Sequence, residues 1–152
     1  MALHDKESIA PFEIGRLISV LYRTGYAYFT HKTADHDLSG VQIGLIFHLY
    51  KHDGVSQDEL TKALEVDKAT VTRSLNKLET CGIIERKRDI DDQRVNRILL
   101  TAHGHALRHD LKRVAKEWQD TLLKGFSEQE IEVLASMFNK LTDNARAFRE
   151  TL

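Results

Sequence analysis

Apolar residues recur three or four positions apart over most of the chain, and this spacing places them on one face of a helix. The helices predicted in this way cover residues 12–31, 39–52, 56–66, 67–81, 101–122 and 127–148. The pattern changes at residues 83–88 and 95–100, two short runs on either side of a charged loop that are typical of a β-hairpin. Val55 is predicted to pair with this hairpin as a short strand. The predicted fold class is therefore mainly α with a small β-hairpin wing.

Local sequence signals specify where several of these helices begin. Three serines are followed three positions later by a residue that can return a hydrogen bond to the serine amide, and these capping boxes are Ser39 with Gln42, Ser56 with Glu59, and Ser127 with Glu130. Asp67 and Thr101 are suitable N-caps, and Gly82 suits a helix end. The short turn between the helices that begin near 56 and 67, followed by the hairpin, predicts a winged helix-turn-helix.

Positive charge is concentrated in this part of the chain. Residues 68–97 contain eight lysines and arginines against five acids, a net charge of +3, whereas the whole chain has a formal charge of −1. The exposed face of the 67–81 helix carries hydroxyls, an amide and cations, with no carboxylate between the Asp67 cap and Glu79. Such groups donate hydrogen bonds to phosphates and base edges. The overall charge argues against bulk nucleic-acid binding, so we expect a local DNA contact.

The chain resembles the MarR family of bacterial transcription regulators over nearly its whole length. The motifs that carry the resemblance are Asp92-x-Arg94, Leu100-Thr101-x-x-Gly104, Leu38-Ser39 with Gln42, and the helix DKATVTRSLNKLE. The resemblance implies a dimer whose recognition helices enter successive major grooves and whose wing arginine reaches the flanking minor groove. It also implies a repressor that a small ligand releases from a palindromic operator.

The predicted DNA contacts lie on the two helices of the helix-turn-helix and on the wing. They are Ser56, Gln57, Lys68, Thr70, Thr72, Arg73, Lys77, Lys87, Arg94 and Arg97. Arg73 can make a bidentate contact to guanine, and Lys68 and Lys77 are assigned to phosphates. Arg94 is expected in a narrow minor groove, with Asp92 fixing its direction.

The helices at the two chain ends carry apolar stripes too extensive for the small winged lobe to cover. We predict one domain, residues 1–152, in which 38–101 form the DNA-binding lobe while 8–33 and 102–152 form a homodimer interface. The residues expected in this interface include Leu17, Leu21, Trp118, Leu122, Phe138 and Phe148. The alternative is a bundle within one chain.

An effector site is open to two interpretations. Tyr22, Tyr26 and Phe29, with His48, are candidates to line a pocket for a small molecule, but aromatic residues at helical spacing more often form plain core, which is the favoured interpretation. No cofactor is predicted, and the identity of any effector stays open.

Two histidine pairs have the spacing of metal ligands, but no cysteine or acid completes either set. They are His48 with His52 and His105 with His109, and surface or dimer-junction positions are favoured for them, so no metal is predicted. Cys81 is interpreted as a small packed residue, with redox sensing as the less favoured alternative.

Composition excludes several other classes of protein. One cysteine rules out an internal disulfide, and no apolar run approaches the roughly 20 residues that span a bilayer. The N-terminal residues lack a signal-peptide core, so we expect a cytoplasmic protein without a membrane partner. No phosphate loop, nucleophile elbow or metalloenzyme pattern is present, which argues against an enzyme. The leading hypothesis is a sequence-specific regulator of double-stranded DNA; the competing one is a helical protein-interaction module whose winged helix does not read DNA.

Overall fold

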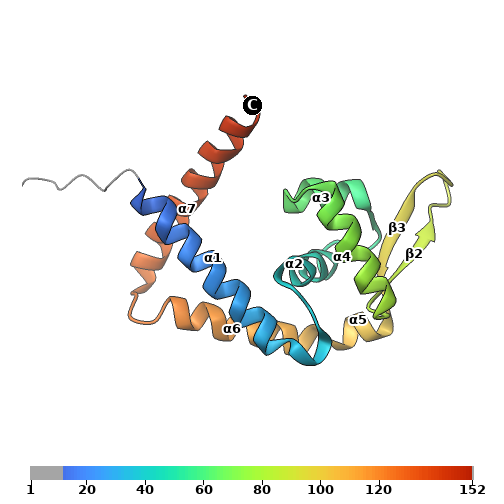
Figure 1. Ribbon diagram of the computed structural model, residues 1–152, viewed down its shortest axis with the longest axis horizontal. Helices are drawn as coiled ribbons and strands as arrows, with labels where there is room; N and C mark the ends of the chain where they lie inside the picture. The colour runs from blue at the N-terminus through green and yellow to red at the C-terminus, as the bar shows by residue number, and fades with distance from the viewer. Residues whose placement is uncertain (1–11, 152) are drawn as a thin grey trace, which may run out of the picture. The chain divides into compact units, whose positions relative to one another are not determined.

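Helices dominate the fold, as the apolar spacing predicts, and the predicted fold class is confirmed (Figure 1). The computed structural model describes residues 12–151. Its helices and strands are, in chain order, α1 (Glu13–Lys32), the 3₁₀ turn η1 (Ala34–His36), α2 (Gly40–Leu49), β1 (Val55–Ser56), α3 (Gln57–Leu64), α4 (Lys68–Thr80), β2 (Ile84–Arg88), β3 (Asn96–Leu100), α5 (Ala102–Ala106), α6 (Arg108–Leu122) and α7 (Glu128–Arg149). These elements belong to two units, residues up to Ala115 and from Lys116 onward.

The predicted helix starts are confirmed in atomic detail. At α3, the amide of Glu59 donates to Ser56 Oγ over 3.2 Å and the amide of Ser56 donates to Glu59 Oε2 over 2.7 Å. Ser39 and Ser127 form the same reciprocal boxes at α2 and α7. Asp67 accepts from the amide of Thr70 over 2.9 Å at the start of α4. These bonds satisfy first-turn N–H groups that have no partner within the helix.

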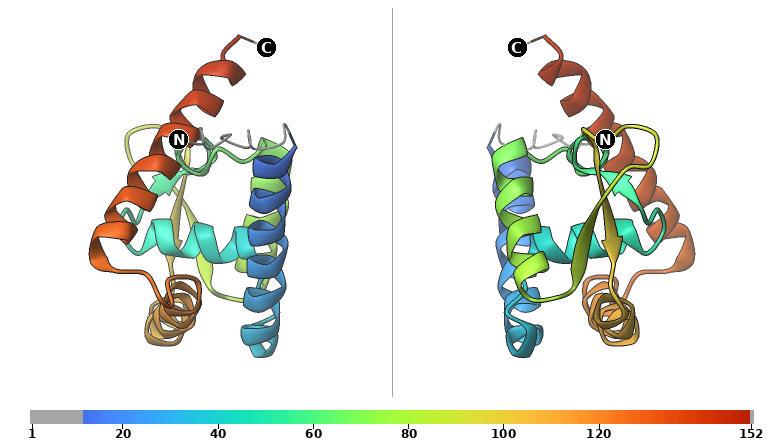
Figure 2. Two further views of the ribbon diagram at one scale, coloured as in Figure 1. Left: turned by 90° about the vertical axis from the view of Figure 1, so that its left-hand side faces the viewer. Right: turned by 90° about the vertical axis from the view of Figure 1, so that its right-hand side faces the viewer.

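The hairpin and β1 form one antiparallel sheet in the order β1-β3-β2. Val55 lies opposite Ile98, and Ile84 lies opposite Leu100, so the predicted pairing of Val55 with the wing is confirmed. Figures 1 and 2 show the hairpin running from the neighbourhood of α5 to the loop at its far end. The central position of β3 fixes this wing to the segment that leads into α3.

The core of the first unit lies between α2, α3, α4 and the sheet. Its apolar side chains are between 0% and 6% exposed, and they include Leu45, Ile46, Leu60, Val71, Leu75, Leu78, Ile84, Ile98, Leu100 and Leu107. Burying one such side chain stabilises the fold by about 1.5–3 kcal/mol. A core of this extent holds α4 and the wing in fixed positions.

The prediction of one long helix from Thr101 is wrong, because Leu107 separates α5 from α6. Thr101 Oγ1 donates to the carbonyl of Gly82 over 2.6 Å and accepts from the amide of Gly104 over 3.1 Å. A Cβ on Gly104 would lie 2.3 Å from the carbonyl oxygen of Ile83. These contacts hold α5 against the segment that follows α4. The break between α5 and α6 places Leu107 in the core, where its side chain is 5% exposed.

The helix predicted to reach His52 ends earlier, at Leu49. Residues 50–54 form a turn in which the hydroxyl of Tyr50 donates to the carbonyl of Gly104 over 2.8 Å. Burial raises the pKa of Tyr50 to about 12, against the opposing effect of Arg108, whose guanidinium lies 5.3 Å from the ring centre. The turn therefore ties α2 to α5 rather than continuing the helix.

Helices α1 and α7 keep large apolar side chains exposed, each within its own unit. On α1 they include Ile14, Leu17, Ile18, Leu21 and Tyr22, and on α7 they include Val133, Met137, Phe138, Leu141 and Phe148. No residue of α7 is buried in the described chain. Residues 8–11 and 152 of the predicted interface lie outside the described residues. Within residues 12–151, none of the helices combines the length and hydropathy needed to cross a membrane.

Candidate nucleic-acid interface

Helix α4 turns a polar face away from the core. Its buried side is formed by Val71, Ser74, Leu75 and Leu78. The predicted contact residues lie on its other sides, where Lys68 and Arg73 are exposed and Thr70, Thr72 and Lys77 are half-buried. The packing that fixes the apolar side therefore determines which polar groups the helix presents to solvent.

Hydrogen bonds hold several of these polar side chains in place. Gln57 Nε2 of α3 donates to Thr72 Oγ1 of α4 over 2.6 Å, which joins the two helices of the helix-turn-helix. Thr72 Oγ1 in turn donates to the carbonyl of Lys68 over 2.8 Å. Arg73 Nη2 donates to Thr70 Oγ1 over 2.9 Å. The structure thus brings five of the predicted contact residues together on one surface.

Lys68 and Lys77 pair with acids that the sequence interpretation did not associate with them. Lys68 Nζ lies 3.2 Å from Asp58 of α3, and Lys77 Nζ lies 2.7 Å from Asp37, which follows η1. Exposed pairs of this kind contribute only about 0–1 kcal/mol. Phosphate oxygens can therefore replace these carboxylates at small cost.

The wing loop is built around Asp89, which the sequence interpretation also missed. Asp89 Oδ1 accepts from the amides of Asp91 and Asp92 over 2.9 and 3.0 Å, while Gln93 Nε2 donates to the carbonyl of Asp89 over 3.0 Å. An aspartate that directly follows a strand and precedes a short polar loop is a known signal for such a side-chain turn. That signal was present in residues 89–92.

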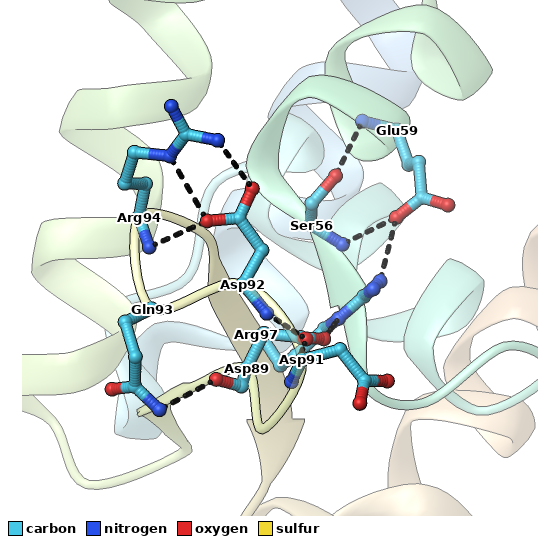
Figure 3. A network of polar contacts seen from close by, with 8 residues as sticks. All are labelled: Ser56, Glu59, Asp89, Asp91, Asp92, Gln93, Arg94 and Arg97. Carbon is cyan, nitrogen blue, oxygen red and sulfur yellow. Dashed lines mark hydrogen bonds and ion pairs between the residues drawn. The ribbon is translucent and has the colours of Figure 1, made fainter.

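Arg94 projects from this loop, and the carboxylate of Asp92 binds both its backbone amide and its guanidinium (Figure 3). Asp92 Oδ1 accepts from the Arg94 amide over 3.0 Å and from its Nε over 3.1 Å, and Oδ2 accepts from Nη2 over 3.3 Å. These hydrogen bonds lower the pKa of Asp92. The Arg94 side chain is nevertheless 91% exposed. A directed but exposed guanidinium is suited to reach a groove.

Arg97, also predicted to contact DNA, has a different environment. Its Nε donates to Asp89 Oδ2 over 2.5 Å and its Nη1 donates to Glu59 Oε2 over 3.3 Å, so it lies between the wing loop and the start of α3 (Figure 3). Its side chain is 38% exposed. The hydrogen bond to Arg97 and those from the loop amides lower the pKa of Asp89 to about 2, and the pKa of Arg97 is raised by the same partner.

Strand β2 adds further charged groups to the wing. Lys87 is exposed and lies 2.7 Å from Glu85 of its own strand. Arg86 contacts Glu79 and donates to Asn76 Oδ1 over 2.8 Å, which joins the wing to the last turn of α4. The side of the wing nearest α4 is therefore fixed by polar contacts as well as by the core.

Of the four candidate effector residues, Tyr22 and Tyr26 are neighbours on α1, with ring centres 6.5 Å apart. Tyr22 is 67% exposed and Tyr26 is 46% exposed, so the favoured interpretation of these tyrosines as core is wrong for a single chain. Phe29 packs against the core of the winged lobe. His48 lines a cavity of about 380 Å³, together with Gly44, Phe47, Lys51, Leu64 and Ala115.

The remaining titratable candidates are dispersed. His48 and His52 have ring centres 5.1 Å apart, and burial, with the nearby charges of His52 and Lys51, lowers the pKa of His48. Among residues 12–151 no group of three or more histidine, cysteine or acidic side chains is arranged to hold a metal ion. Cys81 is exposed, so its interpretation as a packed residue is wrong.

Comparisons with known proteins agree with this geometry. Residues 36–95 match the model of the MarR family. The HTH-type transcriptional regulator YdgJ of Bacillus subtilis is 32% identical over 110 residues, which cover 70% of this chain and 67% of YdgJ. A MarR transcriptional regulator from Methanosarcina mazei Go1 is 30% identical, with a TM-score of 0.86 over 95% of this chain and 97% of its own. A mutant MarR from E. coli, solved with operator DNA, has the same fold at 23% identity, with a TM-score of 0.77 over 87% of this chain and 98% of its own.

Proposed function

The chain belongs to the MarR family of DNA-binding transcriptional regulators, which are not enzymes, and from that premise we propose that it binds a palindromic operator as a homodimer and represses transcription until a small molecule releases it. In this proposal α4 lies in the major groove and the wing reaches the adjacent minor groove. A two-fold symmetric dimer places two such lobes on two half-sites.

One observation carries the DNA-reading part of the proposal. The exposed side of α4 presents Thr70 and Arg73 together, and Arg94 extends from the wing with 91% of its side chain in solvent. Hydroxyls and guanidinium groups are donors for base edges and phosphates. A narrow minor groove has an enhanced negative potential that attracts an inserted arginine.

The exposed apolar side chains of α1 and α7 support the dimer. Monomeric proteins seldom expose large contiguous apolar patches, and such surfaces mark interfaces. A second copy of the chain is the partner that a two-fold symmetric operator requires. The His48 cavity, which also contains Lys51, is the proposed place for an effector, and an acidic group on that effector would complement the lysine.

Selection of bound sequences from a random pool of double-stranded DNA tests the proposal. We expect an enriched palindrome whose half-sites are about one helical turn apart, or a multiple of it. Arg73→Ala is the variant to compare with the wild type. The sites it enriches should show a relaxed base preference at one position in each half-site. A pool that stays random with the wild-type protein would contradict sequence-specific binding and leave the protein-interaction alternative.

A further inference from the structure

Arg97 occupies a point where three parts of the lobe meet. In the register of the sheet it lies opposite Ser56 of β1 on one side and opposite Lys87 of β2 on the other. Ser56 is also the N-cap of α3. The backbone therefore places the Arg97 side chain within reach of both the start of α3 and the loop of the wing.

Both carboxylates that hold Arg97 also organise the backbone around them. Glu59 Oε2, which accepts from Arg97 Nη1, accepts from the amide of Ser56 as well, and so completes the capping box of α3. Asp89 accepts from Arg97 Nε through Oδ2 and from the amides of Asp91 and Asp92 through Oδ1. Arg97 thus joins two local structures whose geometry is already fixed.

These contacts continue as far as the exposed arginine of the wing. The amide of Asp92 is held by Asp89, and the carboxylate of Asp92 holds Arg94. Figure 3 shows the series from Glu59 through Arg97 and Asp89 to Asp92 and Arg94. The position of the Arg94 guanidinium therefore depends on how the wing loop is attached to α3.

We propose that Arg97 is a positioning residue: by bridging Glu59 and Asp89 it locks the wing loop to the start of α3 and so directs Arg94, rather than binding DNA itself. Two of its donor nitrogens are already taken by carboxylates, and its side chain is far less exposed than that of Arg94. The role in DNA binding rests on the proposed function. The locking of the loop does not, and it can be measured without DNA.

Amide hydrogen exchange, followed by NMR on the DNA-free protein, tests the lock directly. Arg97→Met keeps the aliphatic stem but removes both bridges, and we expect exchange at the amides of Asp91 and Asp92 to become at least about tenfold faster, because their acceptor Asp89 is released. Lys87→Met is the matched control, since Lys87 lies opposite Arg97 but pairs within its own strand, and it should leave these amides unchanged. Unchanged exchange in Arg97→Met would overturn the proposal.

A double-mutant cycle on the selected operator tests whether Arg97 acts through Arg94. Arg97→Met alone should weaken binding about threefold to tenfold, but added to Arg94→Ala it should cause no further loss and no further change in the salt dependence. Arg97→Lys keeps the charge that a phosphate contact needs, yet a single ammonium cannot reproduce both bridges, so it should lose affinity as Arg97→Met does. Three results would identify a direct phosphate contact and overturn the proposal. They are affinity losses of Arg97→Met and Arg94→Ala that multiply in the double variant, a salt slope about one unit lower in the double variant than in Arg94→Ala, and wild-type affinity in Arg97→Lys.

The two measurements separate this inference from the proposed function. If the wild-type protein selects no operator while Arg97→Met still accelerates exchange at Asp91 and Asp92, the DNA-binding proposal fails and the lock stands. If an operator is selected but exchange is unchanged, the lock fails and DNA binding stands.

Discussion

The winged lobe and the helices at the chain ends differ in how far they bury their apolar side chains. In the lobe, apolar residues from α2, α3, α4 and the sheet are almost completely buried within one chain. On α7, Met137 is 60% exposed and Phe148 is 64% exposed, and no residue of that helix is buried. The lobe therefore completes its own core, whereas the end helices carry apolar surface that is available for an interface. Lobe stability and dimer formation should consequently respond to different substitutions.

The largest effect is expected from charges placed on the apolar side of α7. Phe138→Asp combined with Leu141→Asp should raise the dissociation constant of the homodimer at least about a thousandfold, or about 4 kcal/mol, because two carboxylates would have to be buried. Analytical ultracentrifugation measures this. Asn139→Asp, on a polar position of the same helix, is the control and should remain dimeric. A double variant that stays dimeric at the same concentrations as the wild type would show that α7 is not in the interface.

A substitution within the lobe should instead lower the free energy of unfolding. Gly104→Ala places a Cβ 2.3 Å from the backbone carbonyl of Ile83, and overpacking of this kind typically costs about 1–3 kcal/mol. Gly44→Ala is the matched control, because its Cβ meets nothing within 4 Å in the middle of α2, and it should be neutral or stabilise the fold by about 0.4–1 kcal/mol. Urea unfolding measures both. Equal stability of the two variants would contradict the close contact between α5 and the segment after α4.

The polar side of α4 should affect DNA binding while leaving the fold intact. Arg73→Ala should cost about 1–3 kcal/mol of operator affinity and relax one base position in each half-site. Lys77→Ala should weaken binding to all sequences alike, since its ammonium is assigned to a phosphate. Fluorescence anisotropy on the selected operator and on single-base variants separates the two. If Lys77→Ala changed base preference and Arg73→Ala did not, the assignments would be reversed.

The smallest effect concerns the pH dependence of the wing. The pKa of Asp89 is about 2 in the folded protein, below the roughly 3.9 of an unfolded aspartate. A lowered pKa contributes stability that is fully present above the unfolded value and disappears as the pH falls through the folded one. The melting temperature of Asp89→Asn should therefore lie below that of the wild type above about pH 5, and the difference should narrow as the pH falls from 4 towards 2. A difference independent of pH would contradict the ionic role of Asp89.

The parts of the fold that could be predicted from sequence are those fixed by neighbouring residues. Ser56 and Glu59 lie one helical turn apart, so their reciprocal hydrogen bonds follow from the order of residues alone. The same holds for the Asp67 cap and for the Asp92–Arg94 pair, whose members are two residues apart. The apolar spacing likewise predicted which side of α4 faces the core, because that side repeats with the helical period.

The features that sequence did not predict depend on residues far apart in the chain. Leu107 interrupts a helical pattern because α5 is held against Gly82 and Ile83, some twenty residues earlier. The pairing of Lys77 with Asp37 and of Arg97 with Glu59 crosses about forty positions in each case, and no local signal marks either pair. Residue type alone therefore assigned Arg97 and Arg94 the same role, although their surroundings differ.

Operator binding by Arg94→Ala tests the central claim, that a rigid lobe reads DNA through α4 and an exposed wing arginine. Because the side chain is almost fully exposed, its removal should leave the melting temperature nearly unchanged. At one fixed salt concentration, affinity for the selected operator should fall at least about tenfold, or about 1.4 kcal/mol. Equal affinity of the wild type and Arg94→Ala would remove the wing from the mechanism.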